Sequence, residues 1–191
     1  EILGEQIRGK KAPVEALKAA IDQVFGQAVL KNEPFAPTDP FKEVFGDSED
    51  VLSLQDTSYE VSNIDGLFEN LMETVFGKVP MIDDKAAAVS NVDGLFENLM
   101  VPENENCIYG IDYEWVFDFP IPSGFVRYRN LVYFYYKYEG LMEYENATQF
   151  LKEFGMDEKL AETYASMEVA FQTWVHGDGT QGYLGNYKQR L

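Results

Sequence analysis

Apolar residues recur at helical spacing near both ends of this chain. In residues 12–30 they step by three and four, and Pro13 suits a first helical turn, so a helix is predicted there. Its stripe consists of Val14, Leu17, Ile21, Val24 and Ala28.

Two further helices are predicted in the C-terminal part. The first carries Leu141, Tyr144, Thr148 and Leu151 and ends near Gly155. The second begins after Asp157 as its cap and ends at His176-Gly177. Its apolar stripe predicts that Phe171 and Trp174 lie in the core. The stripe consists of Leu160, Tyr164, Met167, Phe171 and Trp174.

Strand spacing occurs once, in residues 113–119, where aromatic and mostly acidic residues alternate. The Pro- and Gly-containing residues 120–124 end this strand. Residues 125–138 fit either a helix or a strand, and their Tyr, Phe and Val content slightly favours a strand.

Prolines 34, 37 and 40 lie three residues apart, which is the repeat of a polyproline II helix. Residues 33–41 are therefore predicted to form a stiff extended spacer. A ligand for an SH3-type groove is the less favoured alternative.

A twelve-residue motif occurs twice. Residues 61–72 (the first copy) and 89–100 (the second copy) differ only at Ile64 and Val92. A Val-Phe-Gly triplet precedes each copy, at 44–46 and 75–77, and a third triplet lies at 24–26. Residues 42–72 and 73–100 are therefore interpreted as two tandem repeat units.

Each copy is predicted to form a short amphipathic helix. Ser62 with Asp65 and Ser90 with Asp93 have capping-box spacing. A helix of about eleven residues is marginal alone, so its apolar face must dock on something. The predicted partner-binding residues are Leu67, Phe68, Leu71, Met72, Leu95, Phe96, Leu99 and Met100.

The same motif partly resembles the middle of a calcium-binding EF-hand loop, through Asn63–Gly66 and Asn91–Gly94. On that alignment the two ends of the loop are Val and Met instead of acidic ligands. No metal is therefore expected at the repeats, and no cofactor is predicted for the chain.

The net charge of −18 argues against nucleic-acid binding, which needs a basic face. A hydrophobic content of 46% is that of a folded protein, so the acidity does not mark a disordered tail. The single cysteine, Cys107, excludes an internal disulfide and is expected to be a buried thiol. No apolar run is long enough for a membrane span. Glu1 with no visible leader indicates either a processed chain or a start that was not assigned. Processing together with the absence of disulfides favours an organellar protein, of a plastid or mitochondrion, over a secreted one.

Catalytic residue patterns are scarce. His176 is the only histidine, and its position at a helix C-terminus favours a dipole interaction over catalysis. The glycosylation sequon at Asn146 falls in a predicted helix and is interpreted as coincidence. The tyrosine-rich residues 133–138 are expected in an aromatic core; a pigment or lipid pocket, or contact with a membrane surface, is the alternative.

These patterns predict a helix-rich α+β fold. An extended N-terminal arm with short helices would comprise residues 1–41, the repeats 42–100, and a compact aromatic-rich domain of short strands and a helical hairpin 101–191. We expect a non-enzymatic linker or scaffold subunit that bridges repeated protein subunits of a larger assembly. Photosystem–antenna complexes of photosynthesis are one such assembly. The alternative is a module that binds a small apolar ligand or pigment, with the repeats packed on each other.

Overall fold

The computed structural model describes residues 15, 18–19, 33–59, 61–62, 88–92, 99–100, 109–110, 115–138 and 144–177. The helix predicted for residues 12–30 is helical at Glu15, Lys18 and Ala19 and otherwise lies outside the described residues. Cys107 and the Val-Phe-Gly triplets at 24–26 and 75–77 also lie outside them.

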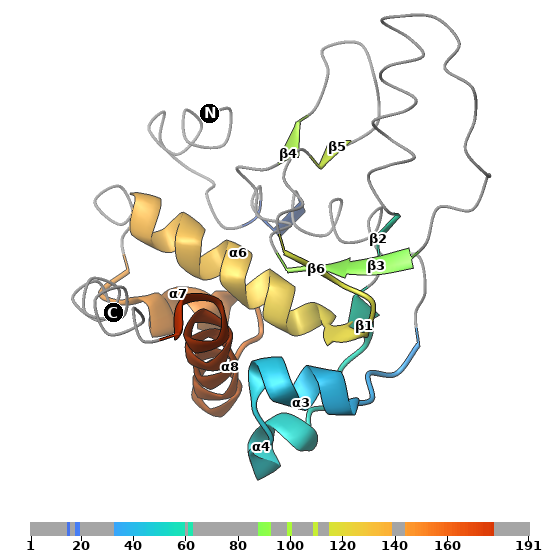
Figure 1. Cartoon of the computed structure of the whole chain (residues 1–191). Helices are drawn as coiled ribbons and strands as arrows, with labels where there is room; N and C mark the ends of the chain where they lie inside the picture. The colour runs from blue at the N-terminus through green and yellow to red at the C-terminus, as the bar shows by residue number, and fades with distance from the viewer. Residues whose placement is uncertain are drawn as a thin grey trace, which may run out of the picture.

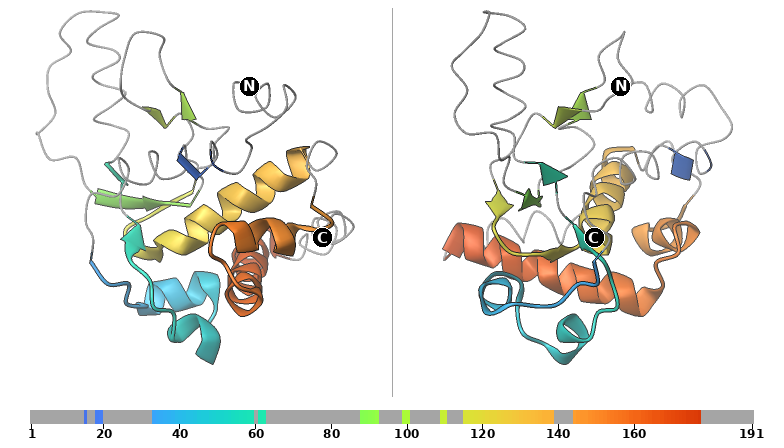
Figure 2. Two further views of the ribbon diagram at one scale, coloured as in Figure 1. Left: turned by 180° about the vertical axis from the view of Figure 1, so that it is seen from behind. Right: turned by 90° about the vertical axis from the view of Figure 1, so that its right-hand side faces the viewer.

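The core is built around one long helix, α8 (Glu158–His176). The helix α6 (Ser123–Tyr138) crosses one side of α8, while α3 (Asp39–Phe45) and α4 (Glu49–Leu52) lie on the other (Figures 1 and 2). The short α7 (Ala147–Glu153) packs against both α6 and α8. The helix-rich α+β fold class and the compact aromatic-rich C-terminal region are confirmed.

Phe45 occupies the centre of this core. Its ring stacks on Phe41 at 5.1 Å and on Phe171 of α8 at 5.8 Å, and it meets Phe125 of α6 edge-on at 5.4 Å. Phe45 belongs to the Val-Phe-Gly triplet at 44–46, the one that lies within the described residues. Gly46 ends α3 with a φ of +89°, a conformation that suits glycine. This triplet thus forms the C-terminal end of α3 and places Phe45 in the core.

The strands are short and antiparallel. The first pair joins β1 (Ser58–Tyr59) to β7 (Ile121–Pro122), and the last joins β4 (Leu99–Met100) to β5 (Tyr109–Gly110).

Between them lies a three-stranded sheet in the order β2–β3–β6. Its strands are β2 (Val61–Ser62), β3 (Ala88–Asn91) and β6 (Val116–Phe117). Figure 1 shows this sheet beside the N-terminal end of α6. The predicted alternation is confirmed over residues 115–119, since Phe117 is buried while Val116 and Asp118 are exposed.

The slight preference for a strand in residues 125–138 is wrong. They form most of α6, whose buried residues cover a wide part of its surface and so blur any periodicity. Burial against α7, α8 and the β1–β7 pair accounts for the aromatic content of α6. Tertiary packing here outweighs intrinsic strand propensity.

The spacer prediction is wrong at its C-terminal end. Residues 33–38 contain no helix and pair through Pro34 with Thr57, but α3 begins at Asp39 with Thr38 as its N-cap and Pro40 in its first turn. Phe35 is buried, and the Phe35 amide donates to the Asp56 carbonyl at 2.8 Å. These residues pack against the helices, and the division of the chain at 41 and 100 stays a prediction.

The observed limits of the two C-terminal helices agree with the predicted limits, except at the start of the first helix. The predicted cap Asp157 accepts a hydrogen bond from the Leu160 amide at 2.8 Å, and Gly177 ends α8. The preceding helix begins later than predicted, because Asn146 caps α7 and Tyr144 lies before it. The sequon asparagine is therefore an exposed cap and not a residue inside a helix.

Only half of the core prediction for α8 is right. Phe171 is buried, whereas Trp174 is 49% exposed. Trp174 lies near the end of α8, where its ring meets Trp115 at 5.9 Å and Phe117 at 6.0 Å in edge-on contacts. The core ends one helical turn earlier than the stripe does.

Truncation of Phe171 and of Trp174 to alanine should have different effects on stability, because one ring lies in the core and the other at its edge. We expect Phe171→Ala to lower the free energy of unfolding by about 3–5 kcal/mol and Trp174→Ala by clearly less, because a half-exposed ring loses less buried area. Denaturant unfolding of both variants tests this. Equal losses for the two variants would contradict the placement of Trp174 at the edge.

Candidate functional site

The predicted partner-binding residues fall mostly outside the described residues. This applies to Leu67, Phe68, Leu71, Met72, Leu95 and Phe96. Leu99 and Met100 form β4, so the predicted helix does not continue through them. The sequence offers a reason, because a proline at 102 disfavours a helical backbone at the residue before it and so opposes a helix at this end of the copy.

The starts of the two copies pair with each other. Val61 lies opposite Val89 in the antiparallel ladder of β2 and β3, and these are the first residues of the two copies. The strand pair therefore brings equivalent residues together about a local twofold axis, with the two strands running in opposite directions. The starting points of the two copies are therefore neighbours in space, although they are far apart in the sequence.

The second copy runs from this pair into the core. Ser90 and Val92 are buried, and Ser90 lies opposite Phe117 of β6. The Val92 amide donates to the Trp115 carbonyl at 3.1 Å. Its carbonyl accepts a hydrogen bond from Arg129 Nη1. Both backbone groups of Val92 are thus hydrogen-bonded within the fold.

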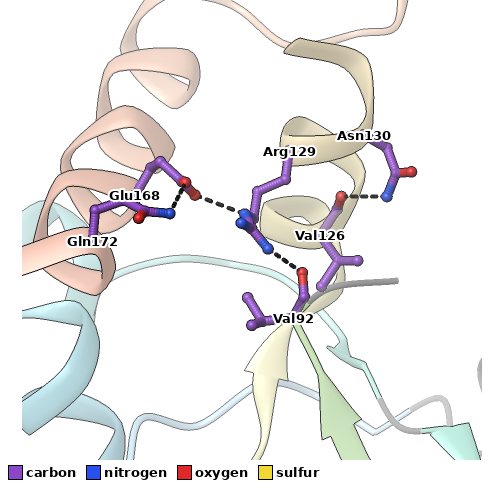
Figure 3. A network of polar contacts seen from close by, with 6 residues as sticks. All are labelled: Val92, Val126, Arg129, Asn130, Glu168 and Gln172. Carbon is purple, nitrogen blue, oxygen red and sulfur yellow. Dashed lines mark hydrogen bonds and ion pairs between the residues drawn. The ribbon is translucent and has the colours of Figure 1, made fainter. Parts of the chain in front are cut away.

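Arg129 is the centre of a buried polar network (Figure 3). Its Nε lies 2.7 Å from Glu168 Oε2, and the two side chains are only 3% and 1% exposed. Gln172 Nε2 donates to the other Glu168 oxygen at 2.8 Å. The guanidinium also lies 5.2 Å from the centre of the Phe171 ring. Arg129 therefore links α6, α8 and the second copy of the motif.

Sequence reasoning missed this network. Arg129 is one of three basic residues in residues 125–138, and Glu168 is one of three acidic residues in α8. A signal did exist in the helical spacing, because Glu168 follows Met167 on the side of α8 that also carries Tyr164 and Phe171. A charge on an apolar helix face indicates a buried partner.

A second network joins α6 to the N-terminal residues. Asp56 Oδ2 accepts hydrogen bonds from the Gly124 amide at 2.9 Å and from the Tyr164 hydroxyl at 2.8 Å. Its other oxygen accepts from the Ser123 hydroxyl at 3.0 Å. Asp56 thereby caps the first turn of α6 from another part of the chain.

Gly124 is required by this packing. A Cβ atom at this position would lie 2.2 Å from the Tyr164 hydroxyl and 2.6 Å from Asp56 Oδ2. The absence of a side chain lets the carboxylate and the phenol approach the helix start together.

The other residues considered for chemistry have mainly structural positions. His176 is exposed at the last position of α8. Phe134 and Tyr135 of the tyrosine-rich segment are buried and lie against the Phe150 ring at 6.5 and 5.5 Å. Over the residues that the structure describes, no three His, Cys, Asp or Glu side chains group closely enough to hold a metal ion. No described helix is long and apolar enough to cross a membrane.

No protein-family model, no curated protein and no solved structure matches this chain.

Removal of Arg129 alone should be more damaging than removal of the ion pair. We expect Arg129→Met to cost about 3–5 kcal/mol, because it leaves the Glu168 carboxylate buried without its charge partner. Arg129→Met combined with Glu168→Leu should recover most of this loss, and urea unfolding of the three proteins measures it. A double variant less stable than Arg129→Met would contradict this account.

Two buried tyrosines should make the fold sensitive to alkali. Burial, together with the Asp56 carboxylate, raises the pKa of Tyr164, and burial with Glu168 raises the pKa of Tyr128. The native state therefore holds these phenolic protons more tightly than the unfolded state does. Their contribution to stability is complete below about pH 10 and falls as the pH rises further.

The measurement is the unfolding midpoint in urea between pH 8 and pH 12. Tyr164→Phe should make the decline above about pH 10 shallower, because it removes one of the titrating groups. A midpoint that rises across this range, or an unchanged slope in Tyr164→Phe, would contradict the assignment.

Proposed function

We propose that this chain is a non-enzymatic linker or scaffold subunit that uses its duplicated motif to bridge repeated subunits of a larger assembly. The supporting observation is the pairing of Val61 with Val89, which places the starts of both copies in one antiparallel strand pair. Two equivalent docking segments that start from one antiparallel strand pair suit two equivalent sites on neighbouring subunits.

The polar residues of the core support a non-catalytic role. The buried Arg129 and Glu168 side chains bind each other, and Arg129 also binds a backbone carbonyl. Asp56 is saturated by four donors, namely the amides of Thr57 and Gly124 and the hydroxyls of Ser123 and Tyr164. These groups bind one another and the backbone, and in doing so they link structural elements within the fold.

The proposed partners are protein subunits and not nucleic acid, since the net charge of −18 would repel a phosphate backbone. A peripheral position on an organellar membrane assembly, of the photosystem–antenna type in a plastid or its counterpart in a mitochondrion, is the setting we propose. The acidic surface keeps such a subunit soluble before assembly.

One observation favours the second candidate function, a module for a small apolar ligand or pigment. The two copies meet at their first residues, as they would if the repeats packed on each other. In that case the apolar faces of the copies would enclose the ligand instead of docking on partners. The two functions differ in whether Phe68 and Phe96 are needed for the fold.

The test uses the tagged full-length chain purified from its native source, with Phe68→Ala, Phe96→Ala and the double variant. Each single change should weaken retention of the partner subunits, and the double change should remove an avidity gain of about a hundredfold. Leu52→Ala is the matched control, because Leu52 is exposed, apolar and outside both copies. The readout is the mass of the complex and the stoichiometry of its identified subunits.

Urea unfolding of the same variants without partners decides between the two functions. The linker function predicts midpoints close to that of Leu52→Ala. Unfolding of the free chain by either single change would identify the motifs as internal packing elements and would exclude the linker function.

A further inference from the structure

The residues 115–117 and Arg129 together hold one extended segment of the chain, and we name them the β6–Arg129 site. In this site Ser90 lies opposite Phe117 and Asn91 opposite Val116. The Trp115 carbonyl and the Arg129 side chain bind the two backbone groups of Val92. Most of this recognition uses backbone atoms, and the side chains that are fully buried are those of Ser90 and Val92.

The first copy offers the same segment. Ser62-Asn63-Ile64 corresponds to Ser90-Asn91-Val92, and the only difference is one methylene group at the buried position. One chain therefore holds two nearly identical ligands for one site.

The first copy is also attached close to this site. Only Glu60 separates β1 from β2, and Tyr59 of β1 lies opposite Ile121 of β7, four residues after Phe117. Continuing the β1–β7 register past Glu60 would place Asn63 opposite Phe117. That register differs by one residue from the register of the second copy, and a single β-bulge corrects such a difference.

We infer that the β6–Arg129 site is a binding site for the extended tetrapeptide Val-Ser-Asn-(Val/Ile), held by the second copy and able to exchange it for the first. The extra methylene of Ile64 overfills a packed position, which weakens the first copy by roughly ten- to a hundredfold. The second copy therefore dominates, and the first replaces it when the second is withdrawn. This inference goes beyond the bridging role and holds with or without a partner.

The test is a double-mutant cycle in the full-length chain with Val92→Asp and Ile64→Asp. A buried aspartate expels the copy that carries it. In Val92→Asp the first copy should occupy the site, so amide hydrogen exchange at residues 115–117 stays slow. Ile64→Asp should then accelerate this exchange at least tenfold more in the Val92→Asp background than in the wild-type background.

Equal effects of Ile64→Asp in the two backgrounds would overturn the inference. If Val92→Asp does not fold, the cycle with Val92→Thr and Ile64→Thr decides on the same criterion. Leu52→Asp is the control for an added surface charge, because Leu52 lies outside the site. Protection in Val92→Asp that depends on protein concentration would assign the ligand to a second chain and would contradict exchange within one chain.

Discussion

The guanidinium of Arg129 is the interaction on which the relation between the helical core and the repeats depends. It binds Glu168 of α8 and the Val92 carbonyl of the second copy while it projects from α6. Burial of two charges is costly, and their attraction offsets this only when the remaining donors and acceptors are also satisfied. The Gln172 amide and the Val92 carbonyl supply such partners, so the network selects one arrangement of three elements.

The aromatic core explains why the N-terminal residues belong to the same unit as the C-terminal helices. Phe45 meets rings from β6, α6 and α8, and Asp56 caps α6 from a point only two residues before β1. Residues 33–59 thereby contribute both a hydrophobic and a polar contact to the helices. The two- to four-residue strands of this fold are too short to be stable alone, so they depend on packing against the helices.

Local signals made some of this structure predictable. The limits of α8 follow from a capping aspartate and a terminal glycine, and the alternation around Phe117 follows from strand geometry, because both depend on neighbouring residues. The helical state of residues 125–138, the exposed Trp174 and the Arg129–Glu168 pair were not predicted, since each depends on residues distant in sequence. The duplication itself was visible in the sequence, whereas the pairing of Val61 with Val89 required the fold.

The second copy of the motif is part of the fold at its start, and we propose that its later residues dock on a partner. Residue-resolved amide hydrogen exchange on the free chain tests this most directly, with wild type compared to Arg129→Met combined with Glu168→Leu. We expect the amides of α6 and α8 to stay protected in both proteins. The Val92 amide should exchange roughly ten- to a hundredfold faster in the variant, because the charged hydrogen bond from Arg129 to the Val92 carbonyl, which holds this segment in place, is lost. Unchanged protection of Val92 in the variant would contradict the role of Arg129 in holding the repeat.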